Sequence, residues 1–400
     1  MRLPREILDG HDGLAQLLDV LGAGEGLIRF VGGAVRDGLL RHRVADIDCA
    51  TLLLPDAVMA RLRAAQIKVV PTGIEHGTVT AVLPSGPVEV TTLRRDVSTD
   101  GRRATIAYSD DWQEDASRRD FTINALYADP LTLEITDFFG GLADLEAHRV
   151  RFIGDPLTRI AEDHLRILRF FRFHARFAAG APDPSALAAC IARANDLMAL
   201  SRERIAAELV HLLNLPDPGL TVALMEREGI FRPVIPEVTA DGVIRLRATI
   251  TSEVESGIQP DPIRRLAALL PPLPMLAEQV AQRLKMSNAN RKRMMVAAGW
   301  SDMAPNDPRA IAWSIGTEGA VDRYLITGGQ SALAAVALLN TWERPVFPLS
   351  GKDIIAHGIR PGPEVARLLQ AVERQWVVEG FPPQARLDEM MRDAVGPSEL

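Results

Sequence analysis

The first part of the sequence alternates short apolar runs with polar stretches, a pattern typical of strands interleaved with helices. The predicted strands lie at residues 27–31, 46–53, 78–83 and 88–93. The last two flank Pro-Ser-Gly-Pro, which predicts a β-hairpin. The predicted helices lie at residues 11–22, 33–40 and 55–66. The opening part of the chain is therefore predicted to mix strands and helices.

A polar segment at residues 94–115, with Gly, Ser, Thr and Asp, interrupts this pattern and predicts a long mobile loop. From residue 156 onward the chain reads as helical, with predicted helices over 156–178 and 201–213. The turn at Pro216-Asp-Pro-Gly219 is a candidate boundary. The fold class is therefore α+β. The predicted domains are a head at 1–148, a helical neck at 149–215, and a helical body and tail at 216–400.

The composition is that of a folded globular protein. Of the 400 residues, 47% are hydrophobic and 24% are charged, so there is enough apolar side chain to offset the entropy of ordering. Two cysteines exclude a disulfide framework and a zinc knuckle. The longest apolar stretch, residues 332–339, falls far short of the roughly 20 residues that span a bilayer. We therefore expect a soluble, cytoplasmic protein that does not associate with membranes.

Arginine supplies nearly all of the positive charge. Of 45 basic residues only four are lysine, and 52 acidic residues bring the formal charge to −7. GC-rich coding is sufficient to explain the arginine bias. Arginine also suits phosphate and base recognition, and a negative net charge does not exclude a local basic face that binds RNA.

Two consecutive glycines separate the first predicted strand from a helix. Gly32 and Gly33 let backbone N–H groups approach phosphate oxygens, and the positive end of the following helix adds to that attraction. Arg36, one turn into the helix, is placed to reach the same phosphates. This turn is therefore a candidate phosphate-binding site.

A pair of aspartates follows on the next predicted strand. Asp46 and Asp48 are two residues apart, so both side chains emerge on one face. Adjacent carboxylates repel each other, and Mg²⁺ prefers such oxygens and shares them with substrate phosphates. Two aspartates spaced in this way, taken alone, are also typical of the exposed end of a surface strand with no metal. The closeness of this pair to the glycine turn favours metal-dependent phosphate chemistry, in which two ions roughly 3.5–4 Å apart hold the attacking and leaving oxygens.

Glu89 is the candidate third carboxylate. It alternates with Val88 and Val90 on a predicted strand, so it lies on the face opposite to them. A glutamate in that position either joins the aspartate pair or faces water.

Seven segments occur in an order and spacing that resemble the class II tRNA nucleotidyltransferases, a family that also contains the bacterial poly(A) polymerases. They are GGAVRD (32–37), DID (46–48), EHGT (75–78), VEVTTLR (88–94), RRDFTINAL (118–126), DFFGGLADL (137–145) and EDHLRILRFFRF (162–173). The resemblance extends from about residue 28 to 213 and is weak beyond about 220. It implies a polymerase-β-like nucleotidyltransferase head followed by an all-α neck, body and tail.

The resemblance also implies roles for the residues around the glycine turn. Asp46 and Asp48 match the family's metal ligands, and Glu89 matches its third acidic catalytic residue. The implied triphosphate-binding positions are Gly32, Gly33 and Arg36.

Two residues of the RRDFTINAL segment match nucleotide contacts of the family. Arg119 matches a contact to the nucleotide, and an ion pair with Asp115 or Asp120 is the structural alternative. Asn124 matches a ribose contact.

Base selection is implied for Asp163 and Arg166. They are three residues apart on a predicted helix, so we expect them to pair and to fix each other's orientation. Asp accepts from the exocyclic amine of cytosine or adenine and Arg donates to the ring nitrogen, whereas uracil and guanine present the opposite pattern. Residues 201–204 with Glu208 resemble a motif that buttresses this helix, a structural role. Further phosphate or ribose contacts are implied for Arg169 and Arg172.

The implied reaction is template-independent addition of C, C and A to the 3′ end of tRNA from CTP and ATP, with Mg²⁺ in a two-metal mechanism. The expected partners are tRNA and the two nucleotides, with no obligate protein partner. Poly(A) polymerase and a tRNA nucleotidyltransferase that adds only A share the same chemistry and stay open as alternatives. An inactive RNA-binding protein on the same scaffold is a further alternative, against which the intact Asp46 and Asp48 weigh.

Overall fold

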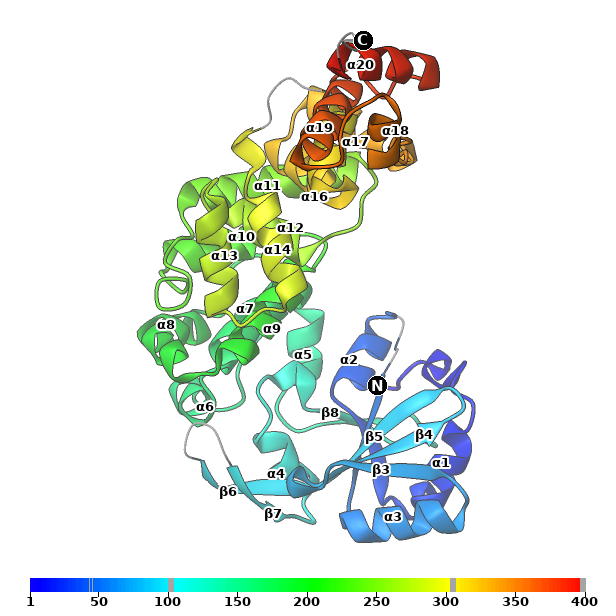
Figure 1. The fold of residues 1–400 in the computed structure, drawn as a ribbon. Helices are drawn as coiled ribbons and strands as arrows, with labels where there is room; N and C mark the ends of the chain where they lie inside the picture. Colours follow the sequence, from blue (N-terminus) through cyan, green and yellow to red (C-terminus); the bar gives the residue numbers. More distant parts are fainter. Residues whose placement is uncertain (43, 45, 100–103, 303–306, 396–400) are drawn as a thin grey trace. The chain divides into compact units, whose positions relative to one another are not determined.

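A computed structural model describes residues 1–400 except 43, 45, 100–103, 303–306 and 396–400 (Figure 1). The chain forms two compact units. The first unit comprises Met1–Leu212 and Glu228–Val234, and the second comprises Leu213–Arg227 and Ile235–Leu400. The α+β class is confirmed, because the strands lie in the first unit and the rest is helical. The predicted three-domain division stays a prediction.

A seven-stranded sheet organises the first unit, in the order β3-β4-β5-β2-β1-β8-β9 (blue to cyan in Figure 1). Its strands are β1 (Ile28–Val31), β2 (Ile47–Thr51), β3 (Lys68–Gly73), β4 (Thr78–Leu83), β5 (Gly86–Thr92), β8 (Leu126–Ala128) and β9 (Ile135–Asp137). The four predicted strands are confirmed as β1, β2, β4 and β5. Strands β2 and β5 pair in parallel, whereas the other neighbours are antiparallel. This pairing brings the D-x-D strand beside the strand of Glu89.

Nine α-helices are described in or at the edge of the first unit. They are α1 (Leu14–Val20), α2 (Gly33–Leu39), α3 (Pro55–Ala64), α4 (Trp112–Ser117), α5 (Gly141–Glu146), α6 (Pro156–Glu162), α7 (Arg166–Phe177), α8 (Pro184–Ala192) and α9 (Arg202–Leu213). The helix predicted at 55–66 is confirmed as α3, with Pro55 in its first turn, where a missing N–H costs nothing.

Two predictions for this unit were wrong. The described residues of the segment 94–115, which exclude 100–103, are not a loop: β6 (Arg94–Thr99) and β7 (Ala104–Tyr108) pair as antiparallel strands of a hairpin, and α4 follows. The helix predicted over 156–178 is broken, because Asp163 adopts extended angles (φ −151°, ψ 106°) between α6 and α7.

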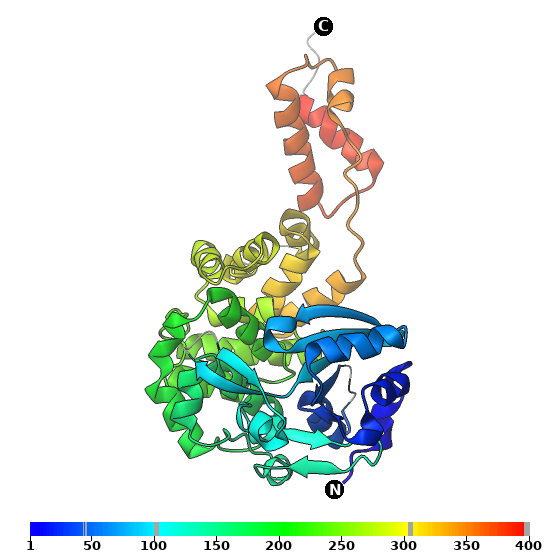
Figure 2. The ribbon, with the colours of Figure 1, turned by 90° about the horizontal axis from the view of Figure 1, so that it is seen from below.

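Helices alone make up the described part of the second unit. They are α10 (Gly219–Arg227), α11 (Ala240–Glu255), α12 (Pro262–Leu269), α13 (Pro274–Arg283), α14 (Asn288–Ala297), α15 (Pro308–Ile315), α16 (Thr317–Thr327), α17 (Gln330–Thr341), α18 (Gly351–Ala356), α19 (Pro363–Val378) and α20 (Gln384–Val395). Figure 2 shows α19 and α20 (orange-red to red) packed side by side at the C-terminal end. Among the described residues no helix is long and apolar enough to cross a membrane.

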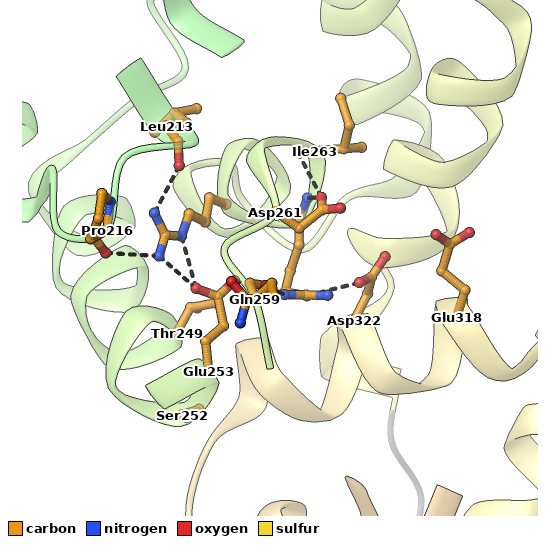
Figure 3. Close-up of polar contacts among 12 residues, drawn as sticks. Leu213, Pro216, Thr249, Ser252, Glu253, Gln259, Asp261, Ile263, Glu318 and Asp322 are labelled. Atoms are coloured by element: carbon orange, nitrogen blue, oxygen red, sulfur yellow. Dashed lines mark hydrogen bonds and ion pairs between the residues drawn. The ribbon is translucent and has the colours of Figure 1, made fainter. Parts of the chain in front are cut away.

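A buried ionic cluster, here called the core network, joins four helices of the second unit. Arg265 of α12 is fully buried and binds Glu253 of α11 through Nε and Nη2, at 2.8 and 2.7 Å. Its remaining donors bind the carbonyl oxygens of Leu213, Leu215 and Pro216, two of which are labelled in Figure 3. The other members of the core network are Arg264, Arg293 and Asp322.

Candidate active site

The three candidate carboxylates lie at neighbouring positions of the sheet. Asp46 directly precedes β2, and Asp48 is the second residue of that strand. In the parallel β2–β5 pair Asp48 stands opposite Glu89. Asp48 is half-buried, whereas Asp46 and Glu89 are exposed. The sheet register therefore places an acidic residue of β5 beside the aspartate pair, which the sequence left undecided.

Electrostatics at Asp48 fit a cation-binding role. Burial and the neighbouring carboxylate of Glu89 raise the pKa of Asp48 to about 6, against the lowering effect of Arg119. In the described part of the chain, no three His, Cys, Asp or Glu side chains converge closely enough to hold a metal by themselves. A divalent ion at Asp46 and Asp48 would therefore need water or substrate phosphate as further ligands, which is how Mg²⁺ is usually held.

The glycine turn brings backbone close to these acids. Gly32 has φ 65° and ψ −120°, a conformation that strains any residue with a Cβ atom. A Cβ atom on Gly33 would lie 3.7 Å from Arg36 Nη2 and 4.0 Å from Asp48 Oδ2. Gly33 is the first residue of α2, and its lack of a side chain leaves space between the glycine turn and the Asp48 carboxylate.

A cavity of about 450 Å³ collects most of the predicted site residues. It is lined by Gly33, Arg36, Asp48, Arg119, Asp120, Asn124, Asp163, Arg166, Arg169 and Phe173. Of the predicted residues, Gly32, Asp46, Glu89 and Arg172 do not line it. A larger cavity of about 610 Å³ in the same unit, near Glu6 and Arg41, contains none of the predicted residues. The smaller cavity is therefore the candidate active site.

Hydrogen bonds join the residues of this cavity into a chain, here called the site network. Arg36 Nη1 donates to Asn124 Oδ1 at 2.5 Å, and Asn124 Nδ2 donates to Asp120 Oδ1 at 2.9 Å. Asp120 Oδ2 in turn accepts two bonds from Arg169, at 2.8 and 2.6 Å. Burial opposes the charge of Asp120, but Arg169 and Asn124 outweigh it and lower the pKa of this carboxyl. The glycine turn and α7 are thus linked through Asp120, which lies in the RRDFTINAL segment and which sequence analysis assigned no site role.

Arg119 forms the predicted ion pair and also lines the cavity, while its contact to a nucleotide stays a prediction. Its Nη2 forms an ion pair with Asp115 Oδ2 at 3.1 Å, while its side chain still lines the cavity. Tyr127 donates to the same Asp115 oxygen at 2.6 Å. Burial opposes ionisation of Asp115, yet Arg119 and Arg118 lower its pKa to about 2. The ion pair therefore holds Arg119 at the cavity.

The predicted pairing of Asp163 with Arg166 was wrong, because the helix breaks at Asp163. Arg166 Nη1 instead binds Glu162 Oε2 at 2.5 Å and the carbonyl oxygen of Arg159 at 2.8 Å. Its Nη2 binds the carbonyl oxygen of Arg118 at 3.1 Å. Both side chains still line the cavity, each held by a different neighbour.

Helix α9 supports this region from outside the cavity. Arg204 Nη2 lies 2.7 Å from Asp163 Oδ2, and Glu208 Oε2 accepts from Arg172 at 2.7 Å. Glu208 also lies 3.7 Å from Arg169. Arg172, implied as a phosphate or ribose contact, is therefore engaged with Glu208 and away from the cavity.

Family models match two parts of the chain. Residues 28–151 match the model described as the poly A polymerase head domain. Residues 181–241 match the model described as a probable RNA- and SrmB-binding site of polymerase A. The first match contains the glycine turn and all three candidate carboxylates.

Whole-chain relatives and solved structures agree with these matches. The CCA tRNA nucleotidyltransferase 1, mitochondrial, of Danio rerio is 34% identical over 395 residues, covering 95% of this chain and 90% of the relative. The CCA-adding enzyme of Lacticaseibacillus paracasei is 31% identical, covering 88% of each. The structure of the Bacillus stearothermophilus CCA-adding enzyme in complex with CTP has a TM-score of 0.75 at 27% identity, covering 94% of this chain and 95% of that one. The Thermotoga maritima CCA-adding enzyme shares the fold, with a TM-score of 0.72 at 18% identity and 99% coverage of both chains.

Proposed function

The chain belongs to the CCA tRNA nucleotidyltransferase family, and we propose that it adds C, C and A to the 3′ end of tRNA from CTP and ATP without a nucleic-acid template. The single observation that carries this proposal is the composition of the 450 Å³ cavity. It unites Asp48, two arginines suited to phosphate, and the Asp163 and Arg166 side chains suited to reading a base.

Asp46 and Asp48 would hold Mg²⁺, with Glu89 as the neighbouring third acid. The raised pKa of Asp48 supports this assignment, because it comes from burial and then from repulsion by Glu89, and a bound cation would stabilise the ionised carboxylate against both. A divalent ion bound there lowers the pKa of the RNA 3′ hydroxyl and neutralises charge on the phosphates.

The protein's own contribution is position and charge. Arg36 and Arg119, which line the cavity, would present positive charge to the triphosphate, and Asn124, which also lines it, is the proposed ribose contact. The 3′ oxygen of the RNA attacks the α-phosphorus of the nucleotide, and pyrophosphate leaves with the electron pair of the broken P–O bond. Because Arg36 is already held by Asp37 and Asn124, it needs little reorganisation when the charge develops.

Base selection follows from the unused donors and acceptors of two residues. The Arg166 guanidinium has five N–H donors, and three of them bind Glu162 and two carbonyl oxygens. The Nε–H and one Nη2–H therefore remain available to a ligand. These two donors suit acceptors on the edge of cytosine or adenine. The Asp163 carboxylate accepts from the exocyclic amine, so uracil and guanine leave both side chains unpaired.

Poly(A) polymerase is the second candidate, because both family models carry polymerase A descriptions. An A-adding tRNA nucleotidyltransferase has the same expected site. The test is incubation of tRNA lacking its CCA end, and separately of tRNA ending in CC, with labelled CTP, ATP, both together, or UTP, followed by sizing of the products. Three added nucleotides ending in A support CCA addition. Long A tracts favour the polymerase, and addition of A only to tRNA that already ends in CC favours the A-adding enzyme.

Transfer RNA is the proposed macromolecular partner, and the helical second unit is the proposed surface for its backbone. The cytoplasmic location stays a prediction, and the Danio rerio relative is described as mitochondrial.

A further inference from the structure

We propose that Arg176 is a positioning residue for the triphosphate-binding arginine, Arg36, and that it acts through the carboxylate of Asp37; this rests on the proposed function. Arg176 lies in the last turn of α7, 139 positions after Asp37 of α2, and both helices belong to the first unit. Arg176 lies outside the seven segments that carry the family resemblance. It does not line the cavity, so it acts on a bound nucleotide through other residues and not by contact.

Asp37 joins the two arginines, with one carboxylate oxygen for each. Its Oδ1 accepts from Arg36 Nε at 2.8 Å, and its Oδ2 accepts from Arg176 Nη2 at 3.1 Å. The side chain of Asp37 is 16% exposed, and that of Arg176 is 39% exposed. Because both oxygens are engaged in charge-assisted hydrogen bonds, Asp37 cannot rotate without breaking one of them. Arg176 therefore fixes the carboxylate that orients Arg36.

Arg36 depends on Asp37 because it is buried. Only 5% of Arg36 is exposed, and burial lowers the pKa of its guanidinium, whereas the hydrogen bond to Asp37 raises it. A buried charge is costly unless a partner of opposite charge is held in good geometry. A change that frees the Asp37 carboxylate therefore also frees Arg36.

The ring of Phe177, the last residue of α7, supports the same arrangement. The Arg36 Cζ atom lies 4.2 Å from the centroid of this ring, and the Arg176 Cζ atom lies 4.8 Å from it. A guanidinium within about 6 Å of a ring centroid is attracted to the ring face, most strongly where water is excluded. Phe177 is buried. The end of α7 thus holds Arg36 in two ways, through Asp37 and through this ring.

The donors that remain on Arg36 lie beside the glycine turn. Within the described residues, Arg36 donates from Nε to Asp37 and from Nη1 to Asn124, which leaves three of the five N–H groups of a guanidinium. A Cβ atom on Gly33 would lie 3.7 Å from Arg36 Nη2. These three donors are therefore available to phosphate oxygens, in the orientation that Asp37 and Arg176 fix.

Helix α7 thereby contributes to the site at both ends. Arg166, its first residue, is a proposed base-reading residue, whereas Arg176 and Phe177 hold the arginine proposed for the triphosphate. Loss of Arg176 should therefore weaken binding of the phosphate chain and leave the choice among bases unchanged. A purely structural residue would weaken binding of every nucleotide, whatever the length of its phosphate chain.

The test compares Arg176→Met and Arg176→Lys with a control, Arg2→Met. Arg2 lies in the same unit, forms an ion pair with Glu134 at 2.9 Å and does not line the cavity, so its loss also removes one positive charge and one ion pair. Calorimetric titration with Mg²⁺ present gives the Kd of CTP. CMP, which lacks the β- and γ-phosphates, is titrated as a competitive inhibitor of CTP addition to tRNA lacking its CCA end. Thermal unfolding of each variant shows that it is folded at the assay temperature.

We expect Arg176→Met to raise the Kd of CTP roughly fivefold and to leave the inhibition constant of CMP within about twofold of the wild type. The ratio of kcat/KM for CTP to that for UTP should stay the same. Arg176→Lys keeps a charged donor and recovers part of the affinity for CTP, and Arg2→Met matches the wild type. An unchanged Kd for CTP in Arg176→Met, equal losses for CTP and CMP, or the same loss in Arg2→Met overturns the inference alone.

The variant Asp37→Asn tests whether Arg176 acts through Asp37. It keeps the shape of the side chain and removes the carboxylate that joins the two arginines. The effect of Arg176→Met should therefore largely disappear in the Asp37→Asn protein, because residues that act through one contact are not additive. Fully additive losses overturn the route through Asp37. A wild-type protein that binds neither CTP nor ATP overturns the proposed function and the inference with it.

Discussion

Two arginine–carboxylate networks in this chain use the same residue types but differ in what surrounds them. The site network of the first unit runs from Arg36 to Arg169 along the wall of a cavity. The core network of the second unit is enclosed by helices, and both Arg265 and Glu253 are only 1% exposed. In the core network the guanidinium of Arg265 is saturated by one carboxylate and three carbonyl groups.

The two regions differ in whether their carboxylates have arginine partners. Within the described residues, no ion pair joins Asp46, Asp48 or Glu89 to an arginine, whereas Glu253 and Asp322 each contact two. Buried carboxylates that are fully paired hold helices together, and breaking one pair leaves an uncompensated charge. Carboxylates left without a paired cation beside a cavity are instead available to a ligand. The first unit therefore leaves carboxylates without arginine partners near its cavity, whereas the second unit pairs its buried carboxylates with arginines.

The largest expected effect comes from the unpaired acids. Asp48→Asn keeps the shape of the side chain and removes its charge, so nucleotide addition to tRNA is expected to fall roughly 10³-fold. The thermal unfolding temperature should stay the same or rise, because Asp48 no longer repels Glu89. The control is Asp56→Asn, an exposed acid on α3. Full activity in Asp48→Asn contradicts the assignment of this site.

A substitution in the core network should lower stability and leave activity unchanged, the opposite of the effect expected for Asp48→Asn. Arg265→Met leaves the buried Glu253 with Arg264 as its remaining partner and removes the donors to three carbonyl groups, so the free energy of unfolding is expected to fall by about 3–5 kcal/mol in urea titrations. At a temperature where the variant is folded, kcat/KM for CTP should match the wild type.

The double variant Arg265→Met with Glu253→Met also removes the underpaired carboxylate, while Arg264 keeps Asp322 as its partner, and is expected to recover part of the loss. A double variant no more stable than the single one argues that packing of the arginine stem, not its charge, holds this region.

The free energy of unfolding should depend on pH through the ion pairs beside the cavity. The folded-state pKa of Asp115 is about 2, below its ordinary value of 3.8, so its pairing stabilises the fold above about pH 4. That stabilisation, about 2 kcal/mol, is lost as the pH falls toward 2. Asp115→Asn should therefore lose less stability than the wild type when urea unfolding at pH 5 is compared with pH 2.5. Equal losses in both proteins would show that Asp115 is not the titrating group.

The smallest effect is expected for an ion pair that solvent surrounds. Arg367 and Glu364 on α19 lie 3.1 Å apart, and their side chains are 69% and 60% exposed. Arg367→Ala should change the free energy of unfolding by less than about 0.5 kcal/mol. A loss comparable with that of Arg265→Met would mean that burial does not account for the difference between ion pairs in this protein.

Local pattern was sufficient to predict the parts of the first unit that carry the chemistry. Strands β1, β2, β4 and β5 follow from apolar runs and turn residues. The positions of Asp46, Asp48 and Glu89 follow from the two-residue period of a strand, and the parallel β2–β5 pairing then fixed which acids are neighbours. The hairpin β6–β7 was missed because β6 is polar and the whole segment 94–115 was interpreted from its Gly, Ser, Thr and Asp content, although β7 (Ala104–Tyr108) contains β-forming residues.

The sequence by itself determined the residue types of the site and their order, because motif spacing and strand period are local properties of the chain. Tertiary structure alone decided their partners: Arg36 with Asn124, Arg169 with Asp120, and Asp163 with Arg204 are separated by 88, 49 and 41 residues. An arginine with several acids in reach takes the partner that packing brings closest. The break at Asp163 and the pairing from α9 therefore depend on how the helices meet.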